Sequence, residues 1–195
     1  DSALKLVKAG TAPGYDNIHP EFLTHLGPRA RTWMSAFFSR IIVENQIPKI
    51  WRKAKVIAIE KPGKDPNLAA SYRPISLLSV CYKLLERLVL QRISPTVESI
   101  RNPDQAGFRK HRSTCDQVSA LTTYIENGFP QNLKTGAVFL DLTAAYDTVW
   151  HTGLFAKLSK NMPYWFVRLV ELLLKNRRFR VHMGNDTSAW RSQLN

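Results

Sequence analysis

The sequence predicts an α+β fold, in which helices pack against short strands. The chain has 195 residues, and 44% of them are apolar, which is enough for the core of one domain or slightly more. Apolar side chains recur at a spacing of four through Pro28–Glu44, as they do in an amphipathic helix. In contrast, Ala54–Lys61 is short and rich in β-branched residues, as strands are. Helical segments and short strands therefore share the chain, which favours α/β or α+β.

The N-terminal half is predicted to hold a turn, two helices and a strand. Ala12–Phe22 carries Pro-Gly and Asp-Asn before a proline that suits the first turn of a helix. The helix Pro28–Glu44 ends before Pro48, and the strand Ala54–Lys61 runs into the turn signal KPGKDPN. A further helix is expected from about Ser79 to Ile93, with leucines facing inward.

The C-terminal half is predicted to begin with a capped helix. Ser113 and Asp116 have the spacing of a capping box, so a helix should follow to about Asn127. The apolar run Gly136–Leu142 does not alternate, which predicts a strand buried on both faces. The remaining expected elements are two helices near His151–Lys160 and Pro163–Lys175, and a hairpin turning at Gly184-Asn185-Asp186.

Charge is the strongest signal in the composition. The chain holds 28 Lys and Arg against 15 Asp and Glu, a net charge of +13. Such an excess predicts a polyanionic partner. Nucleic acid is the first candidate, and a merely basic surface or an anionic membrane is the alternative.

The apolar runs and the cysteines exclude other classes. No run approaches the roughly 18 apolar residues that a membrane span needs. Cys81 and Cys115 stand apart in helical contexts, so neither a disulfide framework nor a zinc site is expected. The chain is therefore expected to be intracellular.

Asp141, at the end of the apolar run, is open to three interpretations. It could cap the next helix or turn, act as a phosphatase-type nucleophile, or bind metal for phosphoryl transfer. The phosphatase interpretation fails, because that chemistry requires an acid two residues on, where the chain has Thr143. Asp147 is no obvious partner, because six residues span roughly 20 Å in a strand and about 240° around a helix. Asp147 is instead predicted to cap a helix that begins near Thr148.

A resemblance to a known family favours the metal interpretation. FLDLTAAYDTVWH resembles motif A of reverse transcriptases, in the jockey-like branch of non-LTR retrotransposons. Other segments resemble further motifs in the family's order: APGYDNIHPEFL, IPKIWRKAKVIAIEKPGKD with YRPISLLSVCYKLLERLVLQRI, DQAGFRKHRSTCDQVSAL, and WFVRLVELLLKNRRFRVHMGN. Each match is weak alone, but four or five in one order are highly specific.

The resemblance implies an architecture. The chain should be a fragment of a right-hand polymerase, with fingers over about residues 1–130 and the start of the palm over about 131–195, ending before motif B. A hairpin from about Ala54 to Leu78 should carry the KPGKDPN turn at its tip. Helices should pack on a short mixed or antiparallel sheet that contains Val138–Leu142.

The resemblance also implies roles at the nucleotide. Asp141 takes the position of the catalytic carboxylate that binds Mg²⁺, with Mn²⁺ as the alternative ion, and the Leu142 carbonyl lies beside the metal. Tyr146 takes the position of a steric gate against the 2′-hydroxyl; the alternative is plain core packing. Arg73 should contact the incoming triphosphate. Lys61 or Lys64 should assist it, although either lysine could belong to a solvated turn.

A second group should line the template or nucleotide cleft. Gly107, Phe108, Arg109 and Arg112 match the family's GFR–RST segment. Arg177, Arg178 and Arg180 in the last hairpin could also meet phosphates, and a solvated face explains them equally well.

The implied activity is RNA-directed DNA synthesis with an RNA template, a DNA primer and deoxynucleoside triphosphates, in a cytoplasmic ribonucleoprotein or the nucleus. The 195 residues contain no Tyr-x-Asp-Asp segment and no Asp-Asp pair. The isolated chain is therefore expected to be inactive, since two-metal catalysis needs several carboxylates. The alternatives are a non-catalytic nucleic-acid-binding module and an inert degenerate copy of such an element.

Overall fold

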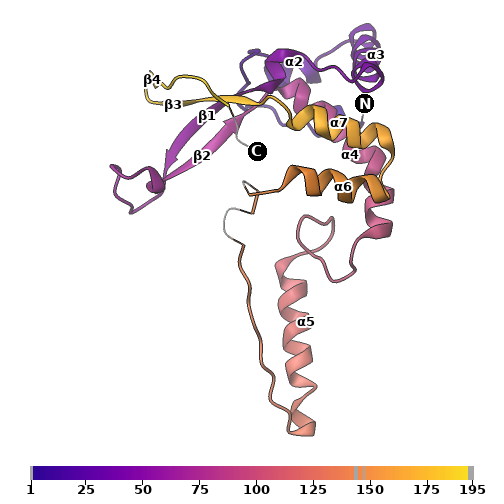
Figure 1. Cartoon of the computed structure of the whole chain (residues 1–195), viewed down its shortest axis with the longest axis vertical. Coiled ribbons are helices and arrows are strands. Elements are labelled where there is room, and N and C mark those ends of the chain that lie inside the picture. Colours follow the sequence, from indigo (N-terminus) through magenta and orange to yellow (C-terminus); the bar gives the residue numbers. More distant parts are fainter. Residues whose placement is uncertain (1, 143–144, 147, 193–195) are drawn as a thin grey trace. The chain divides into compact units, whose positions relative to one another are not determined.

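The structure is a computed structural model that describes residues 2–142, 145–146 and 148–192. Its helices are α1 (Ser2–Lys5), α2 (Pro20–Thr24), α3 (Pro28–Glu44), α4 (Val80–Ile100), α5 (Thr114–Glu126), α6 (His151–Asn161) and α7 (Tyr164–Leu174). Short 3-10 helices cover Lys49–Arg52, Ala69–Ser71 and Phe129–Gln131. The strands are β1 (Lys53–Glu60), β2 (Tyr72–Leu77), β3 (Arg178–Met183), β4 (Asp186–Thr187) and β5 (Arg191–Ser192) (Figure 1).

The strands form one mixed sheet with β1 at its centre. Its order is β2-β1-β3-β4, and β5 also pairs with β3. β1 pairs antiparallel with β2 and parallel with β3, whereas β4 and β5 pair antiparallel with β3. The α+β class predicted from the sequence is confirmed.

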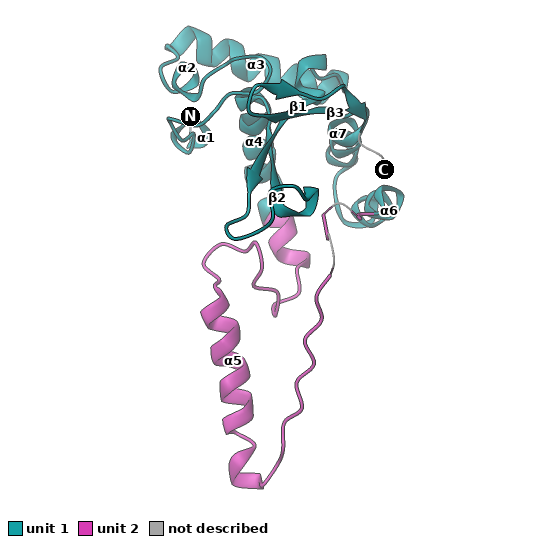
Figure 2. Cartoon of the chain, turned by 90° about the vertical axis from the view of Figure 1, so that its left-hand side faces the viewer, with its two compact units in different colours: residues 1–94, 150–195 teal, residues 95–149 magenta. Residues whose placement is uncertain are grey.

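The chain divides into two compact units (Figure 2). Unit 1 comprises residues 1–94 and 150–195 and contains the whole sheet. Unit 2 comprises residues 95–149 and contains the end of α4 and all of α5. Unit 2 is thus an insertion into the sequence of unit 1.

The core of unit 1 gathers around the first half of α4. Leu85 on α4 and Leu169 on α7 are both 0% exposed, and Phe38 and Ile41 of α3 join the same apolar cluster. Trp51 lies among three aromatic neighbours at 5.9–6.3 Å between ring centroids. This cluster is the main apolar contribution to the stability of unit 1.

Gly14 allows the N-terminal segment to approach the start of α4. A Cβ at this position would lie 2.6 Å from the Ser79 nitrogen. Real Cβ atoms do not come this close to backbone, so any larger residue would push the segment away. The Pro-Gly of the turn-rich segment is therefore explained by packing.

Several predicted elements are confirmed. The helix Pro28–Glu44 has the predicted bounds, and Pro20 begins α2. The Ser113–Asp116 capping box is formed: the Ser113 hydroxyl accepts from the Asp116 amide at 3.3 Å, and the Asp116 carboxylate accepts from the Ser113 amide at 2.7 Å. The hairpins β1–β2 and β3–β4 are also present. Cys81 and Cys115 are both free, as predicted.

The strand predicted for Gly136–Leu142 is wrong. The segment forms no strand, and Val138, Phe139 and Leu140 are 82–89% exposed. The sheet of the described residues therefore excludes Val138–Leu142. A strand exists only where a neighbour pairs with its backbone, and the structure pairs β1 with β2 and β3 instead. An unbroken apolar run indicates that a segment is suited to burial, but it does not show which strand would pair with it.

One helix end differs from prediction. α4 continues to Ile100, past Ile93 and through Pro95, a residue that removes one backbone hydrogen bond from a helix. α6 begins at His151, as predicted for the helix near His151–Lys160, and Trp150 takes its N-cap position. The cap predicted for Asp147 lies outside the described residues.

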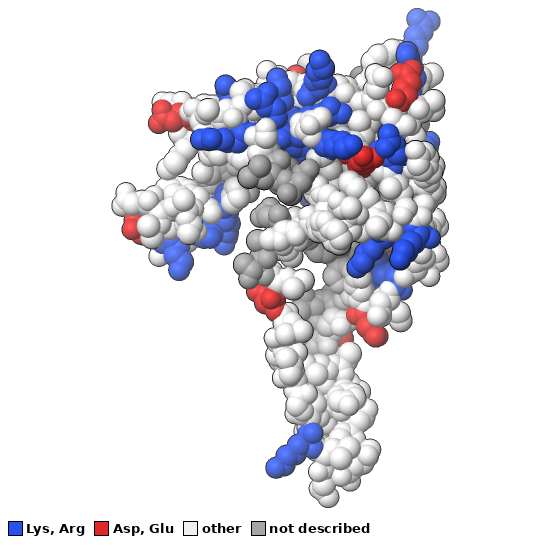
Figure 3. All heavy atoms as spheres, in the orientation of Figure 1, with Lys and Arg blue, Asp and Glu red and all other residues white. Residues whose placement is uncertain are grey.

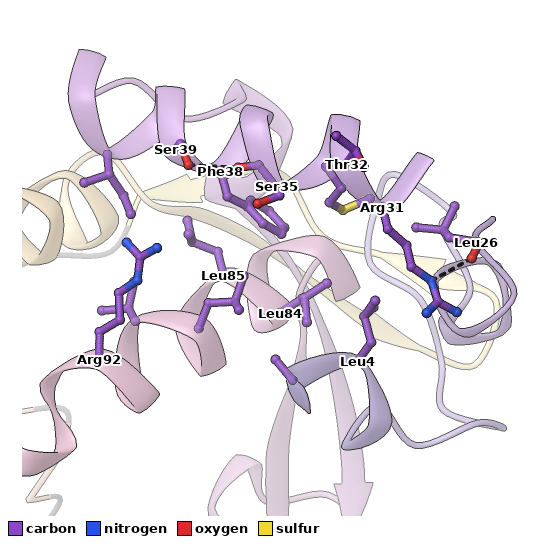
Figure 4. Close-up of a pocket in the computed structure, with 15 residues that line it drawn as sticks. Leu4, Leu26, Arg31, Thr32, Ser35, Phe38, Ser39, Leu84, Leu85 and Arg92 are labelled. Atoms are coloured by element: carbon purple, nitrogen blue, oxygen red, sulfur yellow. Dashed lines mark hydrogen bonds between the residues drawn. The ribbon is translucent and has the colours of Figure 1, made fainter. Parts of the chain in front are cut away.

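A cavity of about 310 Å³ lies between α1, α3 and α4 (Figure 4). Its walls are mostly apolar and include Phe38, Leu84 and Leu85. The Arg31 Nε at its edge donates to the Leu26 carbonyl at 2.7 Å. None of the site residues predicted from the sequence lines this cavity.

Truncation of Leu85 tests the core. We expect Leu85→Ala to lower the free energy of unfolding by about 2–5 kcal/mol, because it removes a fully buried side chain and leaves a void. Leu90→Ala is the matched control on the same helix, since Leu90 is 58% exposed. Urea unfolding followed by circular dichroism measures both, and equal losses would contradict the assigned core.

Candidate nucleotide and nucleic-acid site

The β1–β2 hairpin in unit 1 positions the basic residues expected at a triphosphate. Arg73 lies opposite Ile59, one pair from the end of the ladder where Glu60 meets Tyr72. Arg73 is exposed, and no hydrogen bond or ion pair holds its side chain among the described residues. Arg73 therefore presents its N–H donors to solvent, as an anion-binding arginine must.

The tip of this hairpin is held by its own hydrogen bonds. The Lys61 amide donates to the Ser71 carbonyl at 2.8 Å, and its ammonium donates to the Ala70 carbonyl at 2.7 Å. Gly63 takes the turn with φ +71°, a conformation that suits glycine. The Lys61 side chain is thus held across the tip by one hydrogen bond, with two N–H donors left for an anion, whereas Lys64 is exposed.

In unit 2, an ion-pair cluster fixes the loop that carries the GFR segment. The Glu98 carboxylate pairs with Arg101 at 3.0 Å and with Arg109 at 3.1 Å. Arg109 also donates to the Pro103 carbonyl at 3.1 Å, and its side chain is only 19% exposed. Arg109 therefore holds the loop together, whereas Arg112 is exposed.

The same loop brings Phe108 against Tyr146. Their ring centroids lie 6.0 Å apart at 83°, an edge-to-face arrangement. Phe108 has φ +57°, which is uncommon for a residue with a bulky side chain. Phe108 and Tyr146 are 91% and 74% exposed, so this contact leaves most of each side chain open to solvent. The structure thus joins two residues that the sequence analysis placed in different motifs.

Asp141 and Leu142 lie on the exposed, extended segment of unit 2. Both are exposed, and Gly107 in the GFR loop is exposed as well. The residues immediately after Leu142, Thr143 and Ala144, lie outside the described part of the chain. The structure therefore assigns Asp141 no hydrogen-bond or metal-binding neighbour within the residues it describes.

The family is decided by comparison with known proteins. Residues 59–191 match the family of reverse transcriptases, described as RNA-dependent DNA polymerases. The chain belongs to the reverse transcriptase family. The resemblance inferred from the motifs is confirmed, down to the jockey-like non-LTR branch.

Three relatives of this reverse transcriptase chain come from transposons of Drosophila melanogaster. It is 38% identical over 188 residues to a probable RNA-directed DNA polymerase from transposon BS, covering 95% of the chain and 21% of that protein. The corresponding protein of the X-element is 34% identical, covering 91% and 20%. The RNA-directed DNA polymerase of jockey is 31% identical, also covering 91% and 20%. The chain thus spans about a fifth of the length of these relatives.

The divalent metal that the reverse transcriptase family implies does not fit the residues described here. No group of three His, Cys, Asp or Glu side chains gathers anywhere in residues 2–142, 145–146 and 148–192. A Mg²⁺ ion takes near-octahedral oxygen ligands, and a single carboxylate supplies too few of them. Asp141 therefore does not form a metal site with its described neighbours.

Sequence reasoning missed Glu98, and it missed the lysines of a basic cluster in which Lys53 and Lys55 lie opposite Arg178 and Arg180. Nothing in the sequence marks Glu98 as the partner of Arg109, eleven positions away. The cluster did leave a signal, because Lys53 and Lys55 alternate in one strand, as Arg178 and Arg180 do in another. A period of two places such residues on one face of a sheet.

The structure shows no membrane-spanning helix among the described residues, since none of their helices combines the length and the hydropathy that a span requires.

Loss of Arg109 should loosen the GFR loop. We expect Arg109→Ala to speed hydrogen exchange of the 101–112 amides about two- to fivefold, since a partly exposed ion pair contributes about 0.2–1 kcal/mol. Arg112→Ala removes an equal charge from an exposed side chain that makes no ion pair among the described residues, and it should leave exchange unchanged. Mass-spectrometric exchange measures both variants. Unchanged protection in Arg109→Ala would show that the loop does not depend on Glu98.

Proposed function

We propose that this chain is the fingers, to about residue 130, and the first part of the palm, about 131–195, of an RNA-directed DNA polymerase. The match of residues 59–191 to the reverse transcriptase family carries this proposal. The substrates would be an RNA template, a DNA primer with a free 3′-hydroxyl, and deoxynucleoside triphosphates. The relatives are named as RNA-directed DNA polymerases, and the proposal assigns the same activity to this chain.

The hairpin of unit 1 would hold the triphosphate. Arg73 offers a planar fork of N–H donors that matches phosphate oxygens, and it has no competing carboxylate among the described residues. Lys61 is already oriented by the Ala70 carbonyl, so its remaining donors are partly pre-organised. Lys64 on the exposed turn would add charge but little orientation. Binding by these groups would position the nucleotide for attack.

Tyr146 would select the sugar of the incoming nucleotide, with Phe108 fixing its ring. A phenol ring beneath the sugar leaves no room for a 2′-hydroxyl, which favours deoxynucleotides. The edge-to-face contact with Phe108 supports this role, because an otherwise exposed ring needs a neighbour to hold one rotamer. Arg109 would act indirectly, because its contacts with Glu98 and Pro103 hold the loop that carries Phe108.

The chain by itself would not polymerise. Asp141 has no described carboxylate beside it, and the 195 residues lack a Tyr-x-Asp-Asp segment. A second function, a non-catalytic nucleic-acid-binding module, is favoured by the net charge of +13 together with these missing acids. An inert copy would show neither polymerisation nor specific binding.

Removal of the gate is expected to relax sugar selection. In a longer chain that includes a Tyr-x-Asp-Asp segment, Tyr146→Ala should lower the deoxy-over-ribo ratio of kcat/KM about tenfold or more, as losing a pocket wall does. Phe108→Ala should lower it about two- to tenfold, the range of an aromatic pair. Phe129→Ala is the control, because Phe129 is 63% exposed in the same unit. Primer extension with each nucleotide class measures the ratio; an unchanged ratio in Tyr146→Ala would leave Tyr146 a packing residue.

The role of Asp141 is tested by removing only its charge. In the same longer chain, Asp141→Asn should abolish primer extension and leave template binding nearly intact, because the amide keeps the shape of the side chain. The 195-residue chain should extend no primer with either Mg²⁺ or Mn²⁺. Robust extension by this chain alone would refute the expectation that further carboxylates are required.

A further inference from the structure

The cavity between α1, α3 and α4 in unit 1 is large enough to hold a small molecule (Figure 4). Its volume of about 310 Å³ lies at the lower end of the roughly 300–1,000 Å³ that is typical of small-molecule sites. Well-packed protein cores leave few voids larger than one water molecule, which takes about 30 Å³ of the liquid. The cavity therefore has room for a ligand of about ten non-hydrogen atoms.

The floor of the cavity is apolar and already shaped by the core. Phe38 of α3 and Leu84, Leu85 and Val89 of α4 line it, and all four are buried members of the main apolar cluster of unit 1. Leu88 packs against the same cluster and also lines the cavity. Side chains that are held in a core do not need to rearrange before a ligand enters. An apolar body can therefore be buried against this floor at little ordering cost.

The hydroxyls on the α3 wall are satisfied within their own helix. The Thr32 hydroxyl donates to the Pro28 carbonyl at 3.1 Å, and the Ser39 hydroxyl donates to the Ser35 carbonyl at 3.0 Å. Thr32, Ser35 and Ser39 all line the cavity. None of the described lining residues is Asp or Glu, so the charged groups around the cavity are arginines alone.

Two arginines stand at opposite ends of the cavity (Figure 4). Arg31 is held at one end, where its Nε donates to the Leu26 carbonyl at 2.7 Å. Arg92 stands at the other end and is exposed, and no hydrogen bond or ion pair holds its side chain among the described residues. The Arg92 guanidinium therefore offers its fork of N–H donors to an anion at the mouth of the cavity.

We propose that this cavity binds a small amphipathic anion, an unbranched aliphatic carboxylate whose chain lies on the apolar floor and whose carboxylate meets Arg92. The aliphatic chain has no polar group that the floor would leave unpaired, and the charge of its carboxylate complements that of Arg92. Octanoate is a carboxylate of the size that the volume allows. The proposal goes beyond the polymerase assignment, because none of the residues expected at the nucleotide or the nucleic acid lines this cavity.

The net charge of the chain must be separated from binding in the cavity. Figure 3 shows Lys and Arg side chains over much of the face that it displays, in keeping with the net charge of +13. Such a surface attracts any anion weakly at many places, and salt screens that attraction. Binding in the cavity should instead depend on the length of the aliphatic chain and on single lining residues.

The test titrates the 195-residue chain with octanoate at about 150 mM salt and follows the backbone amides by NMR. Saturable shifts confined to the lining segments of α3 and α4 are expected, with a Kd of about 1 mM or tighter. Hexanoate should bind roughly tenfold more weakly, because each buried methylene contributes about three- to fourfold. Octylammonium should bind about tenfold or more weakly than octanoate, because its charge is repelled by Arg92.

Two variants locate the site, and a third is the matched control. R92Q should weaken octanoate binding about three- to tenfold, because it removes the partner of the carboxylate. S35F should abolish saturable binding, because Ser35 lines the cavity and the added ring fills it. R29Q removes an equal charge from an exposed position of α3 that does not line the cavity, and it should change the Kd less than about twofold.

Several results would overturn the proposal. Equal weakening by R29Q and R92Q would assign the binding to bulk charge, and shifts that never saturate would do the same. Shifts centred on the β1–β2 hairpin would place the anion elsewhere. Self-association that shifts the same α3 and α4 amides and that octanoate does not suppress would make the cavity an interface between copies of the chain. S35L replaces S35F if circular dichroism shows that S35F does not fold.

Discussion

The pairing of β1 on both of its edges is the constraint on which unit 1 depends. Its antiparallel partner β2 is close in sequence and supplies the hairpin, whereas its parallel partner β3 comes from the far end of the chain. Because side chains alternate along β1, Ala54 and Val56 are buried while Lys53 and Lys55 project from the opposite face. A single strand thus determines both what enters the core and where the charge is displayed.

The candidate residues form two chemically different groups, one in each unit. Unit 1 presents cations on a rigid sheet, and Arg73 shares that scaffold. Unit 2 instead presents Asp141 and Tyr146 on irregular backbone, and α5 within it has no buried residue. Exposed apolar side chains such as Phe139 and Leu140 are characteristic of surfaces that bind another polypeptide segment. The side chains of unit 2 are therefore oriented by a few local contacts, such as that of Phe108 with Tyr146. In unit 1, the backbone pairing of the strands orients the side chains instead.

Local signals in the sequence predicted the local features of the fold. The spacing of apolar residues predicted the bounds of α3, and the capping box of Ser113 and Asp116 predicted the start of α5. Features that depend on distant partners were not accessible in this way. Gly136–Leu142 has the composition of a buried strand, yet composition cannot supply the neighbour that makes one. For the site, the motifs single out Arg73 and Tyr146, whose roles stay predictions. The ion pair between Arg109 and Glu98 arises from a loop geometry that no motif encodes.

The parallel ladder of β1 and β3 has a further consequence for biosynthesis. Lys53 and Arg178 are partners 125 positions apart (178 − 53). A ribosome adding roughly 5–20 residues per second would need roughly 6–25 s to produce the second strand after the first. During that interval one edge of β1, with its unpaired amides and carbonyls, is open to other chains, as any incomplete sheet edge is. High contact order also slows the closing step itself. The nascent polypeptide is thus most prone to aggregation while the ribosome is translating the residues between β1 and β3, 61–177, and a chaperone that shields β1 would act in that window.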